Sequence, residues 1–316
     1  MRYTIRSYRA ADAERVVALA DGLYPEYGDD REAWRAAEQF DPRNSSPHQF
    51  VALAAGSGEL VGYGGLRTNR LPWARLDLVV ASDHRRRGVG GRLLAALEDG
   101  LHALGAASVH ARVRADFEDA LAFLTRRGFS ERHRMQGVRL ALDKVSYETL
   151  ARHEQAAVGA GYAIVTLAQE MVSGHYWRAA LRALCNDVMV GWPDPDPAPP
   201  GPMSDETYDH WLALVEPERM FLAKAADRYV GFSSLVAFGT AVHPAHRGRG
   251  VATALKARAV ADAKRRGCRR VESCTAQPAM LAINEKLGYV RHRAEVRVLK
   301  MLTTASSGAV GALASA

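Results

Sequence analysis

Hydrophobic and polar residues follow two periods along this chain, and these periods predict an alternation of strands and helices. In Tyr3–Tyr8 polar and apolar residues alternate, as they do in a strand with one buried face. In Asp12–Leu23 apolar residues return every three or four positions, which predicts a helix with one buried face. The turn-forming segments Gly56–Gly58 and Asn69–Pro72 separate the apolar runs that follow and favour an antiparallel meander.

The same criteria give an order of elements for each half of the chain. In the first half we expect strand Tyr3–Tyr8, helices Asp12–Leu23 and Arg31–Phe40, strands Gln49–Ala55, Leu60–Thr68 and Arg75–Ala81, helix Arg87–Leu104, strand Ser108–Val113, helix Phe117–Arg127, and one or two closing strands in Ser130–Leu142. In the second half we expect strand Tyr162–Leu167, helices His175–Asp187 and Asp205–Val215, strands Met220–Ala225, Tyr229–Leu235 and Val236–Val242, helix Arg249–Arg266, strand Arg270–Thr275, helix Ala279–Leu287 and strand Val290–Lys300. The link at Leu235–Phe238 lacks a turn residue, so the hairpin there is either very tight or one strand is truncated.

Two landmarks indicate that the second half is a duplicate of the first. A basic, glycine-containing segment occurs around Arg85 and again around Arg247, and a glycine followed by an aromatic residue occurs at Gly128 and again at Gly288. Both pairs are separated by about 160 residues, far more than the period of a solenoid repeat. We therefore expect two copies of one domain.

The duplication sets the expected domain boundaries. The N-terminal domain spans residues 1–145, a linker spans 146–160, the C-terminal domain spans 161–302, and a disordered tail spans 303–316. The proline-rich segment Pro193–Pro202 falls inside the second domain. It is either a stiff surface loop or one wall of a substrate entrance.

Composition narrows the class of protein. The 316 residues are 48% hydrophobic and 24% charged, as in ordinary globular proteins and unlike disordered or fibrous chains. No apolar run reaches the roughly 18 to 20 residues of a membrane span, and the N-terminus lacks the apolar centre of a secretory signal. The three cysteines build neither a disulfide framework nor a zinc site, so we expect a cytoplasmic protein without a metal.

The duplicated basic segment has the chemistry of an anion site. Arg85–Gly90 and Arg247–Ala252 both fit Arg-x-x-Gly-x-Gly/Ala, and both follow an apolar strand and open a helix. Unpaired N–H groups and the positive end of the helix dipole favour a bound anion, and small residues let a diphosphate approach the backbone. The Walker pattern is absent from both copies, and the position after the fourth strand does not suit a Rossmann fingerprint.

These motifs, together with the closing helix Ala279–Tyr289, resemble the GNAT superfamily of acetyl-CoA-dependent N-acetyltransferases, and more narrowly its tandem, two-domain members. The resemblance implies an α/β (α+β) fold: two tandem domains, each with a mixed, mostly antiparallel sheet that is splayed between strands 4 and 5 and flanked by helices. It also implies that coenzyme A is held by two sets of residues: Val79, Val80, Arg85, Arg86, Arg87, Gly88, Val89, Gly90 and Gly91 in the first domain, and Ala241, Val242, Arg247, Gly248, Arg249, Gly250, Val251, Ala252, Thr253 and Asn284 in the second.

The catalytic groups of that family are only partly present. Many members carry a tyrosine four residues before the closing glycine as the acid for the leaving thiolate, and here Leu124 and Asn284 take that place. Asn284 is expected to contact coenzyme A or to contact only its helix neighbours. Asp77 and Glu272 are candidate bases, with an ordinary ion pair as the alternative for each.

The predicted function is transfer of an acetyl group from acetyl-CoA, as co-substrate, to a primary amine of a small molecule by direct attack. One domain is expected to be active and the other to be structural or only to bind coenzyme. Both are expected to be able to bind coenzyme, and the better closing helix favours the second for turnover. The alternative is an acyl-CoA-binding module in which neither domain turns over. The net charge of +7 is also compatible with nucleic-acid binding, but the arginines are dispersed along the sequence, so we do not expect nucleic acid as a partner. We also expect no membrane partner. The expected oligomeric state is a monomer or a homodimer.

Overall fold

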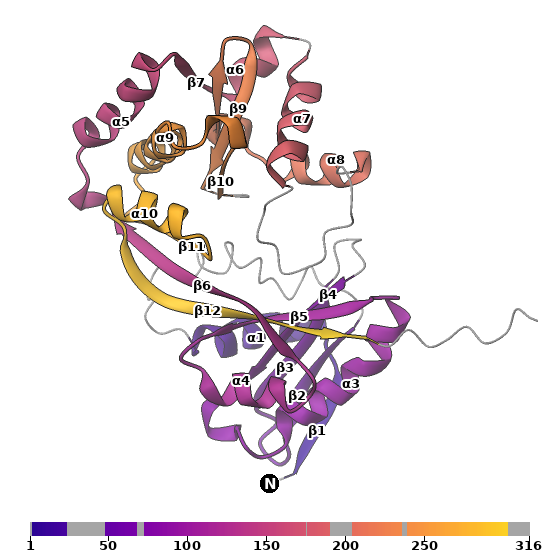
Figure 1. Cartoon of the computed structure of the whole chain (residues 1–316). Coiled ribbons are helices and arrows are strands. Elements are labelled where there is room, and N and C mark those ends of the chain that lie inside the picture. Colours follow the sequence, from indigo (N-terminus) through magenta and orange to yellow (C-terminus); the bar gives the residue numbers. More distant parts are fainter. Residues whose placement is uncertain are drawn as a thin grey trace, which may run out of the picture. The chain divides into compact units, whose positions relative to one another are not determined.

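The chain forms two units, each of which takes residues from distant parts of the sequence. The computed structural model describes residues 2–23, 48–67, 73–174, 176–189, 204–235 and 239–302. Unit 1 comprises Met1–Val113, Phe117–Arg132 and Arg297–Ala316; unit 2 comprises Arg114–Asp116 and His133–Val296. Each unit is described by itself below (Figure 1).

Unit 1 is built on an antiparallel meander that ends in a parallel pair. Its elements are β1 (Tyr3–Ser7), α1 (Ala13–Asp21), β2 (Gln49–Ala54), β3 (Leu60–Arg67), β4 (Trp73–Val80), α3 (Val89–Ala103), β5 (Ser108–Arg114) and α4 (Glu118–Thr125). Strands β1 to β4 pair antiparallel in sequence order. The parallel ladder between β4 and β5 covers Trp73–Arg75 and Ser108–His110, so the carboxyl half of β4 lies beyond it.

Helices cover both faces of this sheet. On one face, Val89 and Leu93 of α3 are buried against β3, where a Cβ added to Gly62 would lie 3.0 Å from each of their side chains. Glycine at this position therefore lets the helix approach the strand closely. On the other face, Val16 of α1 packs with Tyr63, because successive residues of a strand point to opposite sides.

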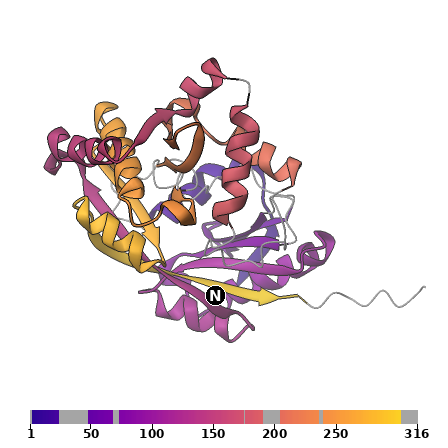
Figure 2. The same cartoon turned by 45° about the horizontal axis from the view of Figure 1, so that its top comes forward.

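Unit 2 repeats the meander and the two helices that follow it. Its elements are β6 (Ser130–Ala141), α5 (Tyr147–Gly159), β7 (Tyr162–Thr166), α6 (Leu167–Ser173), α7 (Trp177–Met189), α8 (Asp205–Ala213), β8 (Met220–Ala225), β9 (Arg228–Ser234), β10 (Gly239–Val242), α9 (Val251–Arg265), β11 (Arg270–Thr275), α10 (Pro278–Lys286) and β12 (Val290–Met301). Strands β10, β9, β8 and β7 form one sheet, whereas β11 pairs with β6 in another. The sheet is therefore open between β10 and β11, the strands that match β4 and β5. Helices α5 and α10 both pack on α9 (Figures 1 and 2).

The two closing strands, β6 and β12, do not stay with their own halves of the sequence. Each is 12 residues long and contributes residues to both units. In unit 1, β12 is the neighbour of β5, and Ser130 donates a hydrogen bond to the Leu299 carbonyl. In unit 2, β6 supplies the partner of β11, with Arg139 opposite Glu272. The last strand of the chain thus lies next to β5 in the sheet that begins with β1.

Within the described residues, the structure confirms the predicted order of strands and helices and adds two helices to it. Residues 147–159, predicted as part of a linker, form α5, which Ser146 caps through its side chain. Helix α6 was not predicted, although Thr166 and Gln169 form a capping box at its start. The closing segment of the first half is a single strand, β6, which is one of the two expected alternatives, and residues 236–238 of the predicted strand Val236–Val242 lie outside the described residues. The predicted helix 31–40, the proline-rich segment 193–202 and the tail 303–316 lie outside the described residues.

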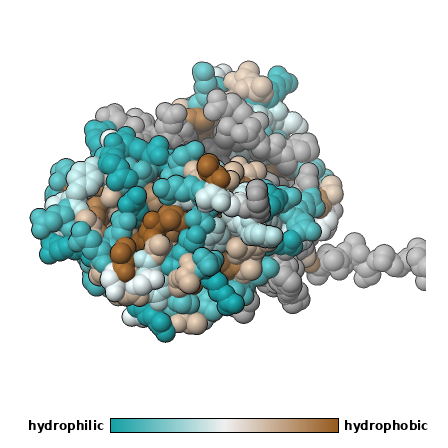
Figure 3. Space-filling view, turned by 90° about the horizontal axis from the view of Figure 1, so that it is seen from above, coloured by the Kyte–Doolittle hydropathy of each residue, from teal (hydrophilic) through white to brown (hydrophobic). Residues whose placement is uncertain are grey.

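The visible surface is mixed in character. Figure 3 shows small brown apolar groups among hydrophilic side chains. Within the described ranges, no helix is long and apolar enough to cross a membrane.

Candidate functional site

The segment between the fourth strand and the following helix has the same conformation in both units. In unit 1 (the unit 1 turn, Ala81–Gly88) a 3-10 turn at Ser82–His84 precedes an extended Arg85; in unit 2 (the unit 2 turn, His243–Gly250) a 3-10 turn at Pro244–His246 precedes an extended Arg247. The two arginines have ψ angles of 161° and 158°. This agreement between copies of different sequence indicates that the path of the backbone is what the repeat preserves.

Left-handed residues then direct the backbone into the helix. Arg86 and Gly88 have φ angles of +58° and +84° in unit 1, and Gly248 and Gly250 have φ angles of +74° and +79° in unit 2. Only glycine adopts this region without strain, so Arg86 is the strained member of the four. The N–H groups of the first helical turn, which no helical carbonyl can reach, carry the positive end of the helix dipole. Such a helix start favours a nearby anion, as the sequence pattern predicts for these turns.

An arginine fastens each turn to its strand. The Nε of Arg85 donates to the Val80 carbonyl at 3.1 Å, and the Nε of Arg247 donates to the Val242 carbonyl at 3.1 Å. These are the strand ends predicted to pair with the pantetheine arm of the coenzyme. Arg85 and Arg247 therefore do more than add positive charge, because each also fixes the strand end beside the turn.

A histidine–tyrosine pair, which the sequence analysis did not identify, ties the first strand of each unit to its turn. The hydroxyl of Tyr3 lies 3.2 Å from Nδ1 of His84, and that of Tyr162 lies 3.1 Å from Nδ1 of His246. In both pairs the ring centroids are 5.8 Å apart and nearly perpendicular. Burial and the nearby Arg249 and His243 lower the pKa of His246, which favours the neutral form of the ring. The signal in the sequence was a tyrosine and a histidine that recur at nearly equal spacing.

Small residues in the first turn of α3 make room for side chains of α4. A Cβ on Gly90 would lie 3.4 Å from the Phe123 ring, and one on Gly91 would lie 3.0 Å from Nη2 of Arg127. The Arg127 guanidinium stacks on Phe123 at 3.6 Å from the ring centroid. Gly90 and Gly91 were predicted to leave space for a phosphate. The stacked pair of Phe123 and Arg127 lies against the same two glycines.

The predicted base of the first domain, Asp77, is held by two arginines. Its carboxylate lies 2.6 Å from Nε of Arg67 and 3.4 Å from Nε of Arg75, and its side chain is only 11% exposed. Asp77 pairs across the sheet with Gly65 and shares the α1-facing side of the sheet with Tyr63 and Val79. Its carboxylate is thus engaged in ion pairs, and its role as a base stays a prediction.

The predicted base of the second domain, Glu272, is engaged in the same way. Oε1 of Glu272 lies 2.7 Å from Nε of Arg139 and 3.5 Å from Nε of Arg270. Nη2 of Arg139 also lies 2.8 Å from Nε2 of His292. Glu272 therefore belongs to a polar network that joins β11, β6 and β12, and its role as a base likewise stays a prediction.

Asn284 is the predicted site residue with the most unusual surroundings. It lies on α10, is completely buried, and neither atom of its side-chain amide has a hydrogen-bond partner in the described part of the chain. Its backbone carbonyl accepts from the N–H groups of Leu287 and Tyr289, which ends the helix. A buried amide without a partner costs stability, so a ligand that supplies partners would be favoured there.

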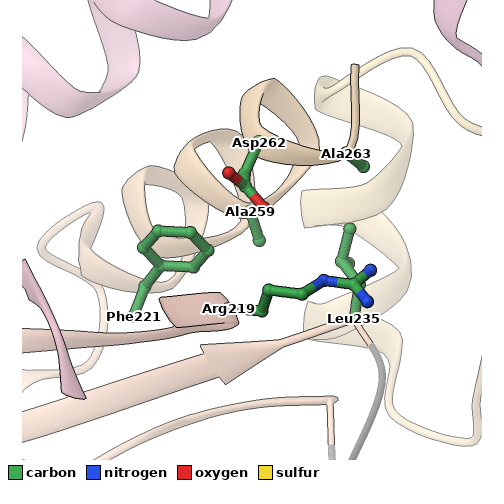
Figure 4. A pocket seen from close by; sticks show the side chains of 6 residues that line it. All are labelled: Arg219, Phe221, Leu235, Ala259, Asp262 and Ala263. Carbon is green, nitrogen blue, oxygen red and sulfur yellow. The ribbon is translucent and has the colours of Figure 1, made fainter. Parts of the chain in front are cut away.

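A small pocket in unit 2 lies elsewhere. Its lining residues come from β8 and the residue before it, the residue after β9, and the second half of α9: Arg219, Phe221, Leu235, Ala259, Asp262 and Ala263 (Figure 4). Ala259 lies eight positions after Val251, about 12 Å along the helix axis from the turn. The pocket is therefore separate from the predicted anion site. Within the described residues, no group of three or more His, Cys, Asp and Glu side chains could hold a metal ion.

Comparison with known proteins identifies the family of this fold and site. The acetyltransferase (GNAT) family matches residues 14–129 and 181–289, one segment in each half of the chain. A segment of 130 residues is 36% identical to the N-alpha-acetyltransferase RimI of Mycobacterium tuberculosis and covers 40% of this chain and 77% of that protein. The chain therefore belongs to the acetyltransferase (GNAT) family, and its class of activity is acyl transfer from acetyl-CoA to an amine.

Two solved structures have the same fold over nearly the whole chain. One is a GCN5-related N-acetyltransferase from Sphaerobacter thermophilus (TM-score 0.68, 20% identity), which covers 95% of both chains. The other is a tandem GNAT protein from the clavulanic acid biosynthesis pathway (TM-score 0.63, 19% identity), which covers 95% of this chain and 98% of that one. These likenesses confirm the expected fold class: helices flank mostly antiparallel sheets that open after the fourth strand.

Proposed function

We propose that this protein transfers an acetyl group from acetyl-CoA to a primary amine of a small molecule, and that each of its two units binds one coenzyme at the turn after the fourth strand. The unit 1 turn and the unit 2 turn would hold the diphosphate through backbone N–H groups. The pantetheine arm would extend along Val79 and Val80 in unit 1 and along Ala241 and Val242 in unit 2, like an added strand.

The conformation of the duplicated turn carries this proposal. In both units an arginine binds the last carbonyl of the strand, two left-handed residues follow, and a helix begins beside the opening of the sheet. A backbone N–H at the strand end would then polarise the thioester carbonyl as it becomes tetrahedral. Direct attack by the amine needs no covalent enzyme intermediate.

Glycine substitutions test the two coenzyme sites separately. Gly88→Val and Gly250→Val place a β-branched residue at φ angles of +84° and +79°, which distorts the turn. We expect calorimetry to find two acetyl-CoA sites in the unaltered protein and each variant to lose one, with affinity at that site falling about tenfold or more. Gly105→Val and Gly267→Val are matched controls, since they lie at φ angles of +62° and +80° beyond the far ends of the same helices. Two intact sites in both turn variants would refute the proposal.

Release of free thiol from acetyl-CoA separates an enzyme from a binding module. A panel of small primary amines is incubated with the protein and acetyl-CoA, and thiol is measured over time. We expect release with at least one amine and formation of the matching amide by mass spectrometry. Coenzyme binding without release by any acceptor would instead support the module that binds acyl-CoA without turnover.

The packing of unit 2 supports a small acceptor. Helices α7 and α8 cover the face of β9 and β10 that is opposite α9, with Tyr208 and Trp211 buried over Phe232. A sheet face that two helices already cover leaves little room for a folded protein. A small molecule is therefore the acceptor that fits this face better. The likeness to RimI, an N-alpha-acetyltransferase by name, favours a protein N-terminus as second candidate, so the panel includes short peptides with free α-amines.

A further inference from the structure

Three polar side chains are buried where α9, α10 and β11 of unit 2 meet. Lys256 of α9 is 3% exposed, Tyr289 after α10 is 3% exposed and Asn284 of α10 is completely buried. Nζ of Lys256 lies 5.3 Å from the centroid of the Tyr289 ring. The Tyr289 hydroxyl and both atoms of the Asn284 amide lack hydrogen-bond partners, and no carboxylate of the described residues pairs with Lys256.

Unit 1 shows that the fold does not need polar groups at these places. The repeat aligns Lys256 with Leu94, Asn284 with Leu124 and Tyr289 with Phe129. All three counterparts are buried, at 6%, 5% and 3% exposure. The same structural positions are therefore filled by hydrocarbon in one unit and by an amine, an amide and a hydroxyl in the other.

Burying unpartnered polar groups destabilises a fold, and an apolar solution of similar size exists within the same chain. Their presence in unit 2 is therefore better explained by a ligand than by packing. Burial lowers the pKa of the Lys256 ammonium to about 8, while the charge of the nearby Cys274 on β11 acts in the opposite direction. The group stays mostly protonated at neutral pH but gives up its proton more readily than an exposed lysine. The Tyr289 ring favours the charged form of the same group.

The cluster also has the right place in the unit. Lys256 lies five residues after Val251, about 8 Å along α9 from the unit 2 turn. Val271 of β11, one of the two strands at the opening of the sheet, belongs to the same core cluster as Tyr289. Asn284 lies on α10, which packs on α9 and beside β11.

Building on the proposed function, we propose that Lys256, which lies beside the Tyr289 ring, is the proton donor to the leaving thiolate in unit 2, and that unit 1 binds coenzyme without turnover. The acceptor nitrogen forms a bond to the thioester carbon, and the carbon–sulfur bond breaks with its electron pair on sulfur. One N–H bond of the Lys256 ammonium breaks and its proton joins the sulfur. The acceptor nitrogen releases a proton to water, and Lys256 regains one from solvent, so the lysine is unchanged after each turnover.

Variants that give unit 2 the residues of unit 1 test this proposal. Lys256→Leu alone, and together with Asn284→Leu and Tyr289→Phe, are compared with the unaltered protein. We expect turnover to fall about a hundredfold or more, which is the usual contribution of general acid catalysis, while the affinity for acetyl-CoA in unit 2 changes less than about threefold. The melting temperature should stay or rise, because hydrocarbon replaces unpartnered polar groups. A merely structural lysine would give the opposite pattern, a lower melting temperature with turnover preserved.

Arg258→Leu is the matched control. Arg258 lies on the same helix, two residues after Lys256, and pairs with Glu154 of α5 at 2.8 Å. Its removal takes one positive charge from α9 without touching the cluster, so turnover should not change. If the triple variant fails to fold, Lys256→Met keeps the hydrocarbon length of the side chain and answers the same question.

A second measurement needs no acceptor and so separates this inference from the proposed function. The ultraviolet absorbance of the thiolate follows the titration of the coenzyme A thiol bound in unit 2, with the Gly88→Val background removing the unit 1 site. A nearby ammonium favours the thiolate, so the thiol should titrate about one unit lower in the presence of Lys256 than in Lys256→Leu. Equal titration in the two proteins, or unchanged turnover in Lys256→Leu, overturns the role of Lys256. Failure of the unaltered protein to bind acetyl-CoA would overturn the proposed function instead.

Discussion

Burial next to positively charged side chains changes the pKa of individual residues in unit 1, and His110 is the clearest case. It lies on β5, is 7% exposed, and its ring meets that of Trp73 edge-on at 5.0 Å. Burial first, and then the charges of Arg297 and Arg132, lower the pKa of His110 to about 4. One of these arginines comes from the last strand of the chain, so the environment of a residue in the first half depends on the second.

Unit 1 should therefore lose stability in mild acid. A histidine whose pKa is lowered by folding is neutral in the folded state, and its contribution is complete above its unfolded pKa of 6.5 and is lost as the pH falls toward about 4. The shift corresponds to about 3 kcal/mol. Chemical unfolding followed at several pH values should show this slope in the unaltered protein and a flatter one in His110→Phe. Parallel slopes would exclude His110 as the cause.

At the scale of elements, the preserved feature is the connection of the fourth strand to a helix through a fixed turn. The arginine–carbonyl bonds fasten the turn to its own strand, and the histidine–tyrosine pairs fasten it to β1 in unit 1 and β7 in unit 2. Both sets of contacts recur with nearly the same distances although the turn sequences differ. In each unit, the position of the first turn of the following helix thus depends on contacts with two strands, the fourth strand and the first strand of that unit.

Removal of the tyrosine hydroxyls should loosen these turns. Tyr3→Phe and Tyr162→Phe keep the ring contacts but delete one hydrogen bond each, so stability should fall by about 1 kcal/mol and acetyl-CoA should bind several-fold more weakly in the altered unit. Calorimetry and thermal unfolding measure both effects. Tyr229→Phe is the control, because its hydroxyl donates to Glu170 at 2.6 Å, away from the turn, and its loss should lower stability without lowering affinity. Equal losses of affinity in all three variants would argue against a specific role of the pairs.

At the scale of the whole molecule, the duplication in sequence does not produce two units of continuous chain. Unit 1 ends with Arg297–Ala316 and unit 2 includes His133–Ala141, so β12 and β6 each serve both. The N–H of Leu302 donates to the Ala107 carbonyl at 2.9 Å, just before β5 begins. The edge of β5 is therefore covered by the end of the chain.

A truncation after Tyr289 should consequently damage unit 1, although most of its sequence remains. The shortened chain lacks β12, so β5 becomes an exposed edge strand and its amides should exchange with solvent much faster. Hydrogen exchange of Ser108–Arg114 measures the effect. A chain that ends at Leu302 keeps β12 and serves as the control, with protection expected to match the full-length protein. Unchanged protection of β5 in the shorter chain would contradict this account of the sheet.

Much of this protein follows from local patterns in its sequence. The alternation of periods predicts the strands and helices, with β11 matching its expected bounds at Arg270–Thr275, because a pattern of buried positions is a local property. The repeated arginine and glycine positions predict the two turns, because left-handed backbone restricts the residues that can occupy it. The sequence also showed that Asn284 stands at the position where many members of the family carry a tyrosine.

Other features depend on contacts between residues far apart in the chain, and only the tertiary structure decided them. Strand pairing is satisfied by any edge of suitable register, so no local pattern could assign β12 to the neighbourhood of β5. The nearest partners of Asp77 and Glu272 are Arg67 and Arg139 on adjacent strands, which spacing along one strand cannot reveal. Lys256 reads in the sequence as an ordinary helix lysine, and it becomes exceptional only because the packing of α9 against Tyr289 removes it from water without supplying a counter-charge.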